Sequence, residues 1–337
     1  MIFIMWEVFI IKKKLSLLTI LCIATVLAFA LFINKNNSHI SIKNEPIENM
    51  KSIVEKLCSY EFEGRRIGTY GNILAEKYIN SIFDSIELEP IGENDFYYDF
   101  PYPQHLTPNG EGKMKSVDVT ANNVIGKISG TDNNKAIILS AHFDHIGKEN
   151  DDIYRGAVDN ASGIATLIQL AIYLKNDSLN SPFKYDIVFA AFNGEEYGLI
   201  GSRDFADEIT NLYDDVININ IDSVGYKDGG NIAFFNTFNI WNVFNKVDSN
   251  NDYIELMSNI KSSLNKYGIN AIEKDLLVGS DDMSFQAKGY TSISISEENI
   301  KKVIHTTNDT AEVIDYSRLE KIVYSLQYFI NNYIILS

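Results

Sequence analysis

The segment that most constrains this fold is IVFAAF at residues 187–192, which carries no polar side chain. A strand of this composition is typical of a parallel sheet that is buried on both faces. Further strand patterns lie at residues 123–127, 136–141, 216–224 and 291–296, and helical patterns lie at 71–86, 162–175, 254–267 and 318–333. The alternation predicts an α/β fold with a mixed, mostly parallel central β-sheet sandwiched by α-helices. Residues 94–117 contain Pro101, Pro103 and Pro108 and predict a hairpin or irregular insertion that is too short for a second domain.

Composition excludes two classes of site. The chain of 337 residues has a formal net charge of −16, whereas a nucleic-acid binder needs clustered Lys and Arg to displace phosphate counterions. Cys22 and Cys58 lie in different parts of the chain, so they predict neither a disulfide framework nor a thiolate metal site. A metal ion would therefore be held by His and carboxylate side chains.

The N-terminus carries a membrane signal. Residues 15–33 are 19 uncharged residues, which as a helix would span roughly 28 Å, and Lys12, Lys13 and Lys14 precede them. The positive-inside rule then predicts that residues 1–14 are cytoplasmic, that 15–33 form a signal anchor, that 34–49 form a tether, and that 50–337 fold outside the cytoplasm, at the cell membrane. A signal peptide cut after Ala28 and Ala30, which would release a secreted protein, is the alternative.

His142 and Asp144, in AHFDHIG, follow the predicted strand at 136–141 directly. Alternate residues of an extended segment point the same way, so the imidazole and the carboxylate share a side. A metal-bound imidazole usually donates its other N–H to a carboxylate or carbonyl, and this pair fits that pattern. By itself an H-x-D sequence is more often structural.

Other carboxylates and one histidine occupy comparable places. Asp159 lies in GAVDNASG before a predicted helix, where it could also simply favour the helix dipole. Glu195 and Glu196 follow the apolar strand in FNGEEYG, and adjacent carboxylates raise each other's pKa unless a cation intervenes. Asp222 ends the strand at 216–224, and His305 follows the strand at 291–296; alone, each reads as a solvated polar residue.

The conjunction of these residues carries more information than any one of them. Most lie at the carboxyl ends of predicted strands, which is where ligands collect in such sheets. Five candidate ligands with one bridging carboxylate suit two borderline-hard divalent ions. They are His142, Asp159, Glu196, Asp222 and His305.

Several segments resemble the zinc aminopeptidase and glutamate-carboxypeptidase superfamily, in particular its secreted bacterial di-zinc aminopeptidases. The matching segments are EGRRIGTYGN, NNVIGKISG, AHFDHIG, GAVDNASG, FNGEEYGLIGS, NIDSVG and HTTNDT, and they cover roughly residues 50–335. The resemblance implies a fold of the zinc-peptidase/phosphorylase-hydrolase type and a membrane-anchored aminopeptidase that removes N-terminal residues from peptide substrates. Residues 50–337 would be its di-zinc catalytic domain.

The resemblance also implies roles for individual residues. His142, Asp159 and Asp222 would hold one Zn²⁺, and Asp159, Glu196 and His305 would hold a second, with Asp159 bridging the two. Asp144 would orient His142, and Glu195 would be the general base that takes a proton from a bridging water. In the family the peptide bond that follows the bridging Asp is often cis, which here is Asp159–Asn160.

The chain departs from the family pattern in three places. Ile304 stands where some members have an oxyanion-donating Tyr, and Asp282 stands where many have a His. The chain also lacks the length for the inserted lid-like domain of many relatives. His145 lies near the site and reads equally well as a structural residue or as one that supports the ligands.

Three other functions stay open. A glutaminyl cyclase of the same fold would use a single zinc ion and lack the first ligating His, whereas His142 is present here. A carboxypeptidase-like member would bind a free carboxylate through Arg or Lys, with Arg65, Arg66 and Arg155 as candidates. A non-catalytic relative would have lost ligands. Substrate preference and oligomeric state are not predicted.

Overall fold

The computed structural model describes residues 45–92, 94–106, 115–236, 251–275 and 279–334. The cytoplasmic segment predicted at 1–14, the anchor or signal peptide at 15–33 and residues 34–44 of the predicted tether lie outside these residues. Residues Ile42–Ser337 form one structural unit. Helix α2 (Pro46–Leu57) begins this unit, so its first turn lies within the stretch predicted as a tether.

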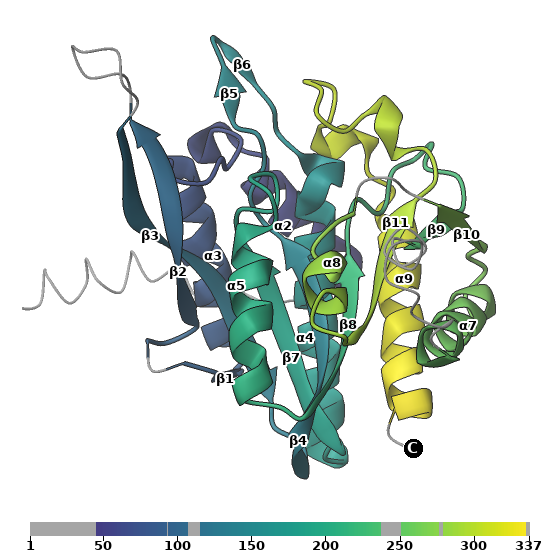
Figure 1. Cartoon of the computed structure of the whole chain (residues 1–337). Coiled ribbons are helices and arrows are strands. Elements are labelled where there is room, and N and C mark those ends of the chain that lie inside the picture. The colour runs from purple at the N-terminus through teal and green to yellow at the C-terminus, as the bar shows by residue number, and fades with distance from the viewer. Residues whose placement is uncertain (1–44, 93, 107–114, 237–250, 276–278, 335–337) are drawn as a thin grey trace, which may run out of the picture. The chain divides into compact units, whose positions relative to one another are not determined.

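A nine-stranded sheet crosses the described part of this unit (Figure 1). Its strands are β1 (Glu89–Pro90), β2 (Tyr97–Leu106), β3 (Lys115–Ile128), β4 (Asp132–His142), β7 (Tyr185–Phe192), β8 (Asp215–Ile221), β9 (Ile232–Asn236), β10 (Ala271–Asp275) and β11 (Thr291–Glu297). They lie in the order β1-β3-β7-β4-β8-β11-β9-β10, with β2 also paired to β3. The sequence order therefore jumps back and forth across the sheet, as in α/β folds.

The four central strands β7, β4, β8 and β11 are parallel, and antiparallel pairs lie on both sides of them. This mixed sheet with a parallel centre confirms the predicted fold class. Strands β2 and β3 pair in antiparallel register from Tyr97↔Val124 to Leu106↔Lys115, so the proline-containing stretch is a hairpin. A second hairpin, β5 (Lys148–Glu149) with β6 (Asp152–Ile153), lies apart from the main sheet.

Helices cover both faces of the sheet. They are α3 (Tyr70–Ser85), α4 (Ser162–Asn180), α5 (Ile200–Glu208), α7 (Asn251–Lys266), α8 (Asp282–Gln286) and α9 (Tyr316–Phe329), in addition to α2. Short helical turns are η1 (Tyr60–Phe62), η2 (Ala157–Ala161), η3 (Ile209–Asn211), η4 (Ile300–Lys302), η5 (Ala311–Val313) and η6 (Ile330–Ile334).

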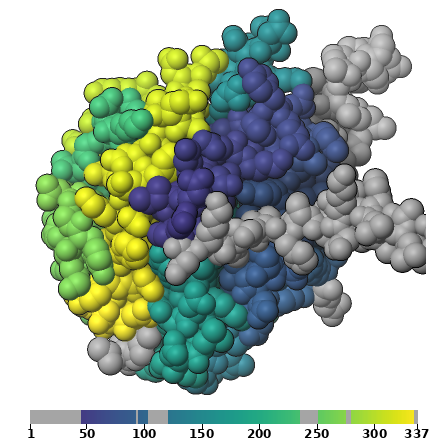
Figure 2. Space-filling view, turned by 180° about the vertical axis from the view of Figure 1, so that it is seen from behind, coloured from purple at the N-terminus to yellow at the C-terminus, as the bar shows by residue number. Residues whose placement is uncertain are grey.

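Alternation along the strands divides the apolar core into two layers. Ile138 of β4 and Val188 of β7 face Phe205 of α5 and Phe285 of α8. Their neighbours Ile137 and Leu139 point to the other face and are buried there. On that face α4 contacts β4, β7 and β8, while α2 and α9 pack against α4. Figure 2 shows α2 lying beside α9 on the outside of this layer.

Helix α4 and the turn before it, Ala157–Asn180, contain an 18-residue window with a mean hydropathy of 1.3. Within the part of the chain that the structure describes, it is the one helix long and apolar enough to span a membrane. However, 89% of that window is buried inside the protein. Its apolar composition therefore follows from its place between the sheet and helices α2 and α9.

Candidate metal centre

The predicted site residues come together at the carboxyl ends of the central parallel strands. His142 is the last residue of β4, Glu195 and Glu196 follow β7, and Asp222 follows β8. Asp159 lies in η2, directly before α4, and His305 lies in the loop that follows β11 and η4. Residues far apart in the sequence thus meet because parallel strands end at the same edge.

Two groups of side chains meet at Asp159. In the first, His142 Nε2 lies 3.2 Å from Asp159 Oδ1 and 3.5 Å from Asp222 Oδ1. In the second, His305 Nε2 lies 3.1 Å from both Asp159 Oδ2 and Glu196 Oε1. The ligand atoms within each group all lie within 4.8 Å of one another. The two carboxylate oxygens of Asp159 therefore point to different groups.

His145 belongs to the second group, a closer association with the site than the sequence indicated. Its Nδ1 lies 2.9 Å from Glu196 Oε1 and 3.8 Å from Asp159 Oδ2. The side chain is fully buried, and its Nε2 has no hydrogen-bond partner. In the sequence, the available signal was that His145 directly follows the H-x-D motif of His142 and Asp144. Spacing alone could not show which way its ring turns.

The donor set fits a bound cation. His142 Nε2 is buried and has no hydrogen-bond partner, although two carboxylates lie in front of it. Buried polar atoms rarely stay unsatisfied, and carboxylates that converge without a cation repel one another. Imidazole nitrogens mixed with carboxylate oxygens suit zinc among the common divalent ions.

The surroundings shift the pKa values of the two adjacent glutamates in opposite directions. Burial raises the pKa of Glu195 well above its ordinary value, opposed by the charge of His142 and reinforced by that of Asp222. Burial also tends to raise the pKa of Glu196, but hydrogen bonds with His145 and His305 outweigh it and lower that pKa. Hydrogen bonds with Asp159 and Glu196 raise the pKa of His305 to about 10. Glu195 is thus the carboxylate of the pair with the greater affinity for a proton.

Asp144 fixes the turn that carries both glutamates. Its carboxylate accepts hydrogen bonds from the backbone N–H of Glu195 at 3.1 Å and of Glu196 at 3.3 Å. His142 Nδ1 lies 3.2 Å from the carbonyl oxygen of Asp144 and 3.7 Å from its carboxylate. The nearer partner of the imidazole is therefore the backbone, and the carboxylate mainly holds the Glu195–Glu196 turn.

The loop that carries Asp159 is held from both sides. The Asp159–Asn160 peptide bond is cis, as the resemblance implied. The Asp309 carboxylate accepts hydrogen bonds from the N–H of Val158 at 2.7 Å and of Asp159 at 3.1 Å. The Asn160 side chain donates to the carbonyl of Ile221 at 2.9 Å, next to Asp222. Sequence reasoning missed Asp309, although it lies in the HTTNDT motif.

Arg65 is the second supporting residue that sequence reasoning did not find. It is completely buried, and its guanidinium donates four hydrogen bonds to backbone carbonyls. They run from Nε to Phe143 at 2.8 Å, from Nη1 to Leu57 at 2.8 Å and Arg155 at 2.7 Å, and from Nη2 to Gly156 at 2.9 Å. Arg65 thereby links the His142 segment to the Asp159 segment.

Two further buried carboxylates, Asp281 and Asp282, follow the serine that binds Asp222. Ser280 Oγ donates a 2.5 Å hydrogen bond to Asp222 Oδ2, and the next two residues, Asp281 and Asp282, are fully buried. Burial raises the pKa of Asp281 to about 7 and that of Asp282 to about 8. Asp282, which stands where many family members have a His, accepts a hydrogen bond from Gln286 Nε2 at 3.0 Å and begins α8.

The sequence is similar to a peptidase family and to several known proteases. The model of "Peptidase family M28" matches residues 123–330. Aminopeptidase YwaD of Bacillus subtilis is 26% identical over 229 residues, which are 64% of this chain and 46% of YwaD. The vacuolar membrane protease of Debaryomyces hansenii is 25% identical over 197 residues, which are 56% of this chain and 18% of that protein. The chain thus spans less than half the length of these relatives.

Solved structures show the same fold at low sequence identity. The aminopeptidase LapA of Legionella pneumophila has a TM-score of 0.64 at 17% identity, covering 86% of this chain and 72% of its own. The zinc aminopeptidase BSAP of Bacillus subtilis has a TM-score of 0.64 at 16% identity, with 84% and 94% covered. A glutaminyl cyclase of Fimbriiglobus ruber has a TM-score of 0.65 at 18% identity, with 86% and 95% covered.

Proposed function

This chain belongs to peptidase family M28, and from that premise we propose that it is a zinc-dependent aminopeptidase with two metal ions in one centre. The observation that carries the proposal is Asp159, whose Oδ1 faces His142 while its Oδ2 faces His305. A carboxylate divided in this way is suited to bridge two ions. The similar protein aminopeptidase YwaD supports the direction of cleavage.

The ligand roles follow from the two groups. His142, Asp159 and Asp222 would hold one Zn²⁺, and Asp159, Glu196 and His305 would hold the other. When bound, such a pair of ions polarises the scissile carbonyl and lowers the pKa of water to near neutrality. His145 would keep Glu196 in place through its Nδ1 contact, and Asp309 and Asn160 would do the same for the Asp159 loop.

Glu195 is the general base in this proposal. Its side chain belongs to neither ligand group. A hydrogen bond from the Glu195 backbone N–H to the Asp144 carboxylate holds this residue next to Glu196. Burial raises its pKa, so it binds a proton more tightly than an ordinary carboxylate and can pass that proton to the leaving amine. Such a base contributes typically ~10²–10⁴-fold to the rate.

We also propose that the catalytic domain is held at the outer side of a membrane. The support is the uncharged stretch at 15–33 behind Lys12, Lys13 and Lys14. In this proposal residues 1–14 are cytoplasmic, and the residues between the apolar stretch and helix α2 tether the domain. Cleavage of the apolar stretch would release the domain instead, and N-terminal sequencing of the mature protein from membrane and soluble fractions distinguishes the two outcomes.

The central experiment is a panel of aminoacyl chromogenic substrates, assayed with and without a chelator. We expect hydrolysis that a chelator abolishes and zinc restores, together with two zinc ions per chain by elemental analysis. Replacing Glu195 by Gln should reduce kcat at least ~10²-fold and leave the zinc content unchanged. Unchanged hydrolysis in the Glu195→Gln variant, or a purified protein that retains no zinc when it is supplied in excess, would rule out the proposal.

A glutaminyl cyclase is the second candidate, because one of the matching folds carries that name. Such an enzyme would bind one zinc ion and cyclise an N-terminal glutamine. His142 and Asp222 argue against it, because they complete a separate first group around Asp159. Incubation with a glutaminyl peptide and mass analysis of the product separates loss of ammonia from loss of a residue.

A further inference from the structure

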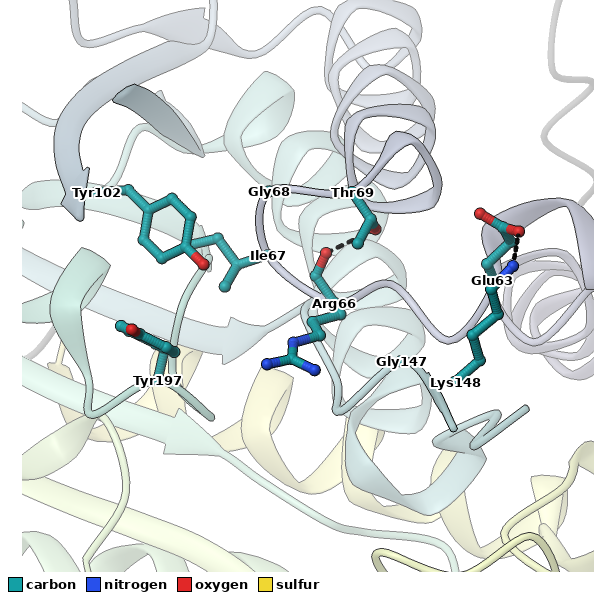
Figure 3. A pocket seen from close by; sticks show the side chains of 9 residues that line it. All are labelled: Glu63, Arg66, Ile67, Gly68, Thr69, Tyr102, Gly147, Lys148 and Tyr197. Atoms are coloured by element: carbon teal, nitrogen blue, oxygen red, sulfur yellow. Dashed lines mark hydrogen bonds and ion pairs between the residues drawn. The ribbon is translucent and has the colours of Figure 1, made fainter. Parts of the chain in front are cut away.

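The structure contains a pocket of about 390 Å³ that is lined in part by residues adjoining the candidate ligands in the sequence (Figure 3). Its walls include Tyr197, which directly follows Glu196, and Gly147 and Lys148, which closely follow His145. Tyr102 of β2 lines it as well; burial raises the pKa of this phenol, and the charges of Arg66 and Asp144 also act on it. The pocket is therefore continuous with the segments that carry the candidate ligands.

Arg66 is the cation of this pocket that is open to a ligand. Three arginines were proposed from the sequence. The guanidinium of Arg65 donates to backbone carbonyls. The guanidinium of Arg155 lies over the ring of Tyr60 and donates to the carbonyl of Cys58. Arg66 is exposed, and its guanidinium forms no ion pair with any carboxylate in the described ranges of the chain. Lys148, the other cation in the pocket, is already paired with Glu63.

The position of Arg66 is built into the backbone. A Cβ on Gly147 would lie 2.7 Å from Arg66 Cβ and 3.2 Å from its Cδ, so the arginine stem lies directly on this glycine. Gly147 has φ of +88°, and its N–H donates to the carbonyl of Gly64 at 3.0 Å. The Arg66 carbonyl accepts hydrogen bonds from the N–H and Oγ1 of Thr69. The guanidinium is thus carried by a fixed stem.

Two tyrosines complete the pocket. The rings of Tyr102 and Tyr197 meet edge to face with centroids 5.3 Å apart. Figure 3 shows the guanidinium of Arg66 extending toward the side of these tyrosines, while Lys148 reaches Glu63 at the opposite end. An aromatic wall beside an unpaired planar cation suits a ligand with a short apolar portion and a carboxylate, because a guanidinium binds a carboxylate with two parallel hydrogen bonds.

We propose that this pocket binds a carboxylate of the peptide substrate through Arg66. The inference rests on the proposed peptidase function and narrows its substrates to peptides with a negative charge near the scissile bond. The carboxylate has two possible sources, namely the free C-terminus of a dipeptide or the side chain of an acidic residue. In both cases Arg66 determines specificity and takes no part in the proton transfer assigned to Glu195.

The test compares three substrates in the zinc-loaded protein: leucyl-glycine, leucyl-glycinamide and leucyl-glutamic acid α-amide. Replacing Arg66 by Met should raise KM for the carboxylate-bearing substrate by about 10- to 100-fold. For leucyl-glycinamide, kcat/KM should stay within about twofold. Arg66→Lys should recover part of the loss, since it keeps the charge but not the planar fork. Whether leucyl-glycine or the glutamyl amide responds identifies the source of the carboxylate.

Lys148→Met is the matched control, because it removes a cation of the same pocket that already has a carboxylate partner. It should leave the preference for carboxylate substrates unchanged. If Arg66→Met affects all three substrates equally, or affects none, the inference is wrong while the proposed function stands.

A binding measurement keeps the two proposals separable. Calorimetric titration of the zinc-loaded Glu195→Gln variant with leucyl-glycine and leucyl-glycinamide should show tighter binding of the free acid, by about 10-fold or more. Adding Arg66→Met should remove that difference. If the wild-type protein cleaves none of the substrates but this difference is present, the peptidase function fails and the carboxylate pocket remains. Equal binding of acid and amide overturns the pocket.

Discussion

Arg65 Nε donates a 2.8 Å hydrogen bond to the carbonyl of Phe143, the residue that separates His142 from Asp144. The same guanidinium donates from Nη2 to Gly156, which opens the turn η2 that carries Asp159. One buried cation therefore fixes two ligand segments that are distant in the sequence. Outer partners of metal ligands typically contribute 10–100-fold to metal affinity or activity.

Arg65→Lys is the sharpest test of this link. Lysine keeps the positive charge, but its single ammonium cannot reach carbonyls that lie on several sides of a planar fork. We expect a folded variant with about 10–100-fold weaker zinc binding, measured by competition with a chromogenic chelator. Arg65→Met should be more damaging, because each buried carbonyl left without a donor costs about 1–3 kcal/mol. A lysine variant with wild-type zinc affinity would show that Arg65 supports only the general fold.

Replacing His145 should weaken the second ligand group selectively. Its Nδ1 lies 2.9 Å from Glu196 Oε1, so His145→Ala would leave that carboxylate less well oriented. We expect kcat to fall about 10-fold or more, with a smaller change in KM. His145→Asn is the matched control, because its side-chain amide can donate from about the position of Nδ1. Equal loss in both variants would show that the buried, unpartnered Nε2 carries the role instead.

Much of the fold could be predicted from the sequence. A fully apolar run such as residues 187–192 is suited to a central strand of a sheet that helices cover on both faces. The ends of these strands then placed His142, Glu196 and Asp222 at one edge. Three helices, α2, α5 and α8, were not predicted. The first begins beside a polar stretch, and the second follows the glutamate turn with few apolar residues.

The supporting residues could not be predicted, because their role depends on backbone geometry. Arg65 forms its bonds to carbonyls at residues 57, 143, 155 and 156, and no periodic pattern records such partners. Asp309 likewise binds two N–H groups of the Asp159 loop. His145 was assigned to either of two roles because the direction of its ring is set by Glu196 and Asp159 across the site.

Glu76 should make stability fall as pH rises. Burial raises the pKa of this carboxyl on α3 from 4.5 to about 7, and Asn122 Nδ2 donates to it at 3.0 Å. The folded state therefore holds a proton that the unfolded state has released, so this group's contribution is lost between pH 4.5 and about 7. Glu76→Gln keeps the acceptor and removes the charge. Its Tm should exceed that of the wild type at pH 8 but not at pH 4.5; a difference independent of pH would contradict this assignment.

Metal removal should destabilise the domain as well as inactivate it, because Asp159, Glu196 and Asp222 converge with imidazoles that include the unpartnered Nε2 of His142. Zinc that binds only the folded state adds about 2.7 kcal/mol per site when free zinc is 100 times its Kd. The Tm measured by calorimetry should therefore rise with zinc and fall with a chelator.

The adjacent glutamates provide the control for this effect. Glu196 is a member of the second ligand group, whereas Glu195 belongs to neither group. Glu196→Gln should lose a large part of the zinc-dependent rise in Tm, because an amide oxygen is a weaker ligand than a carboxylate. Glu195→Gln should keep the full rise while losing turnover, since only its proton transfer is removed. If both variants lose the zinc-dependent rise in Tm to the same extent, the assignment of Glu196 as a ligand and Glu195 as the base is wrong.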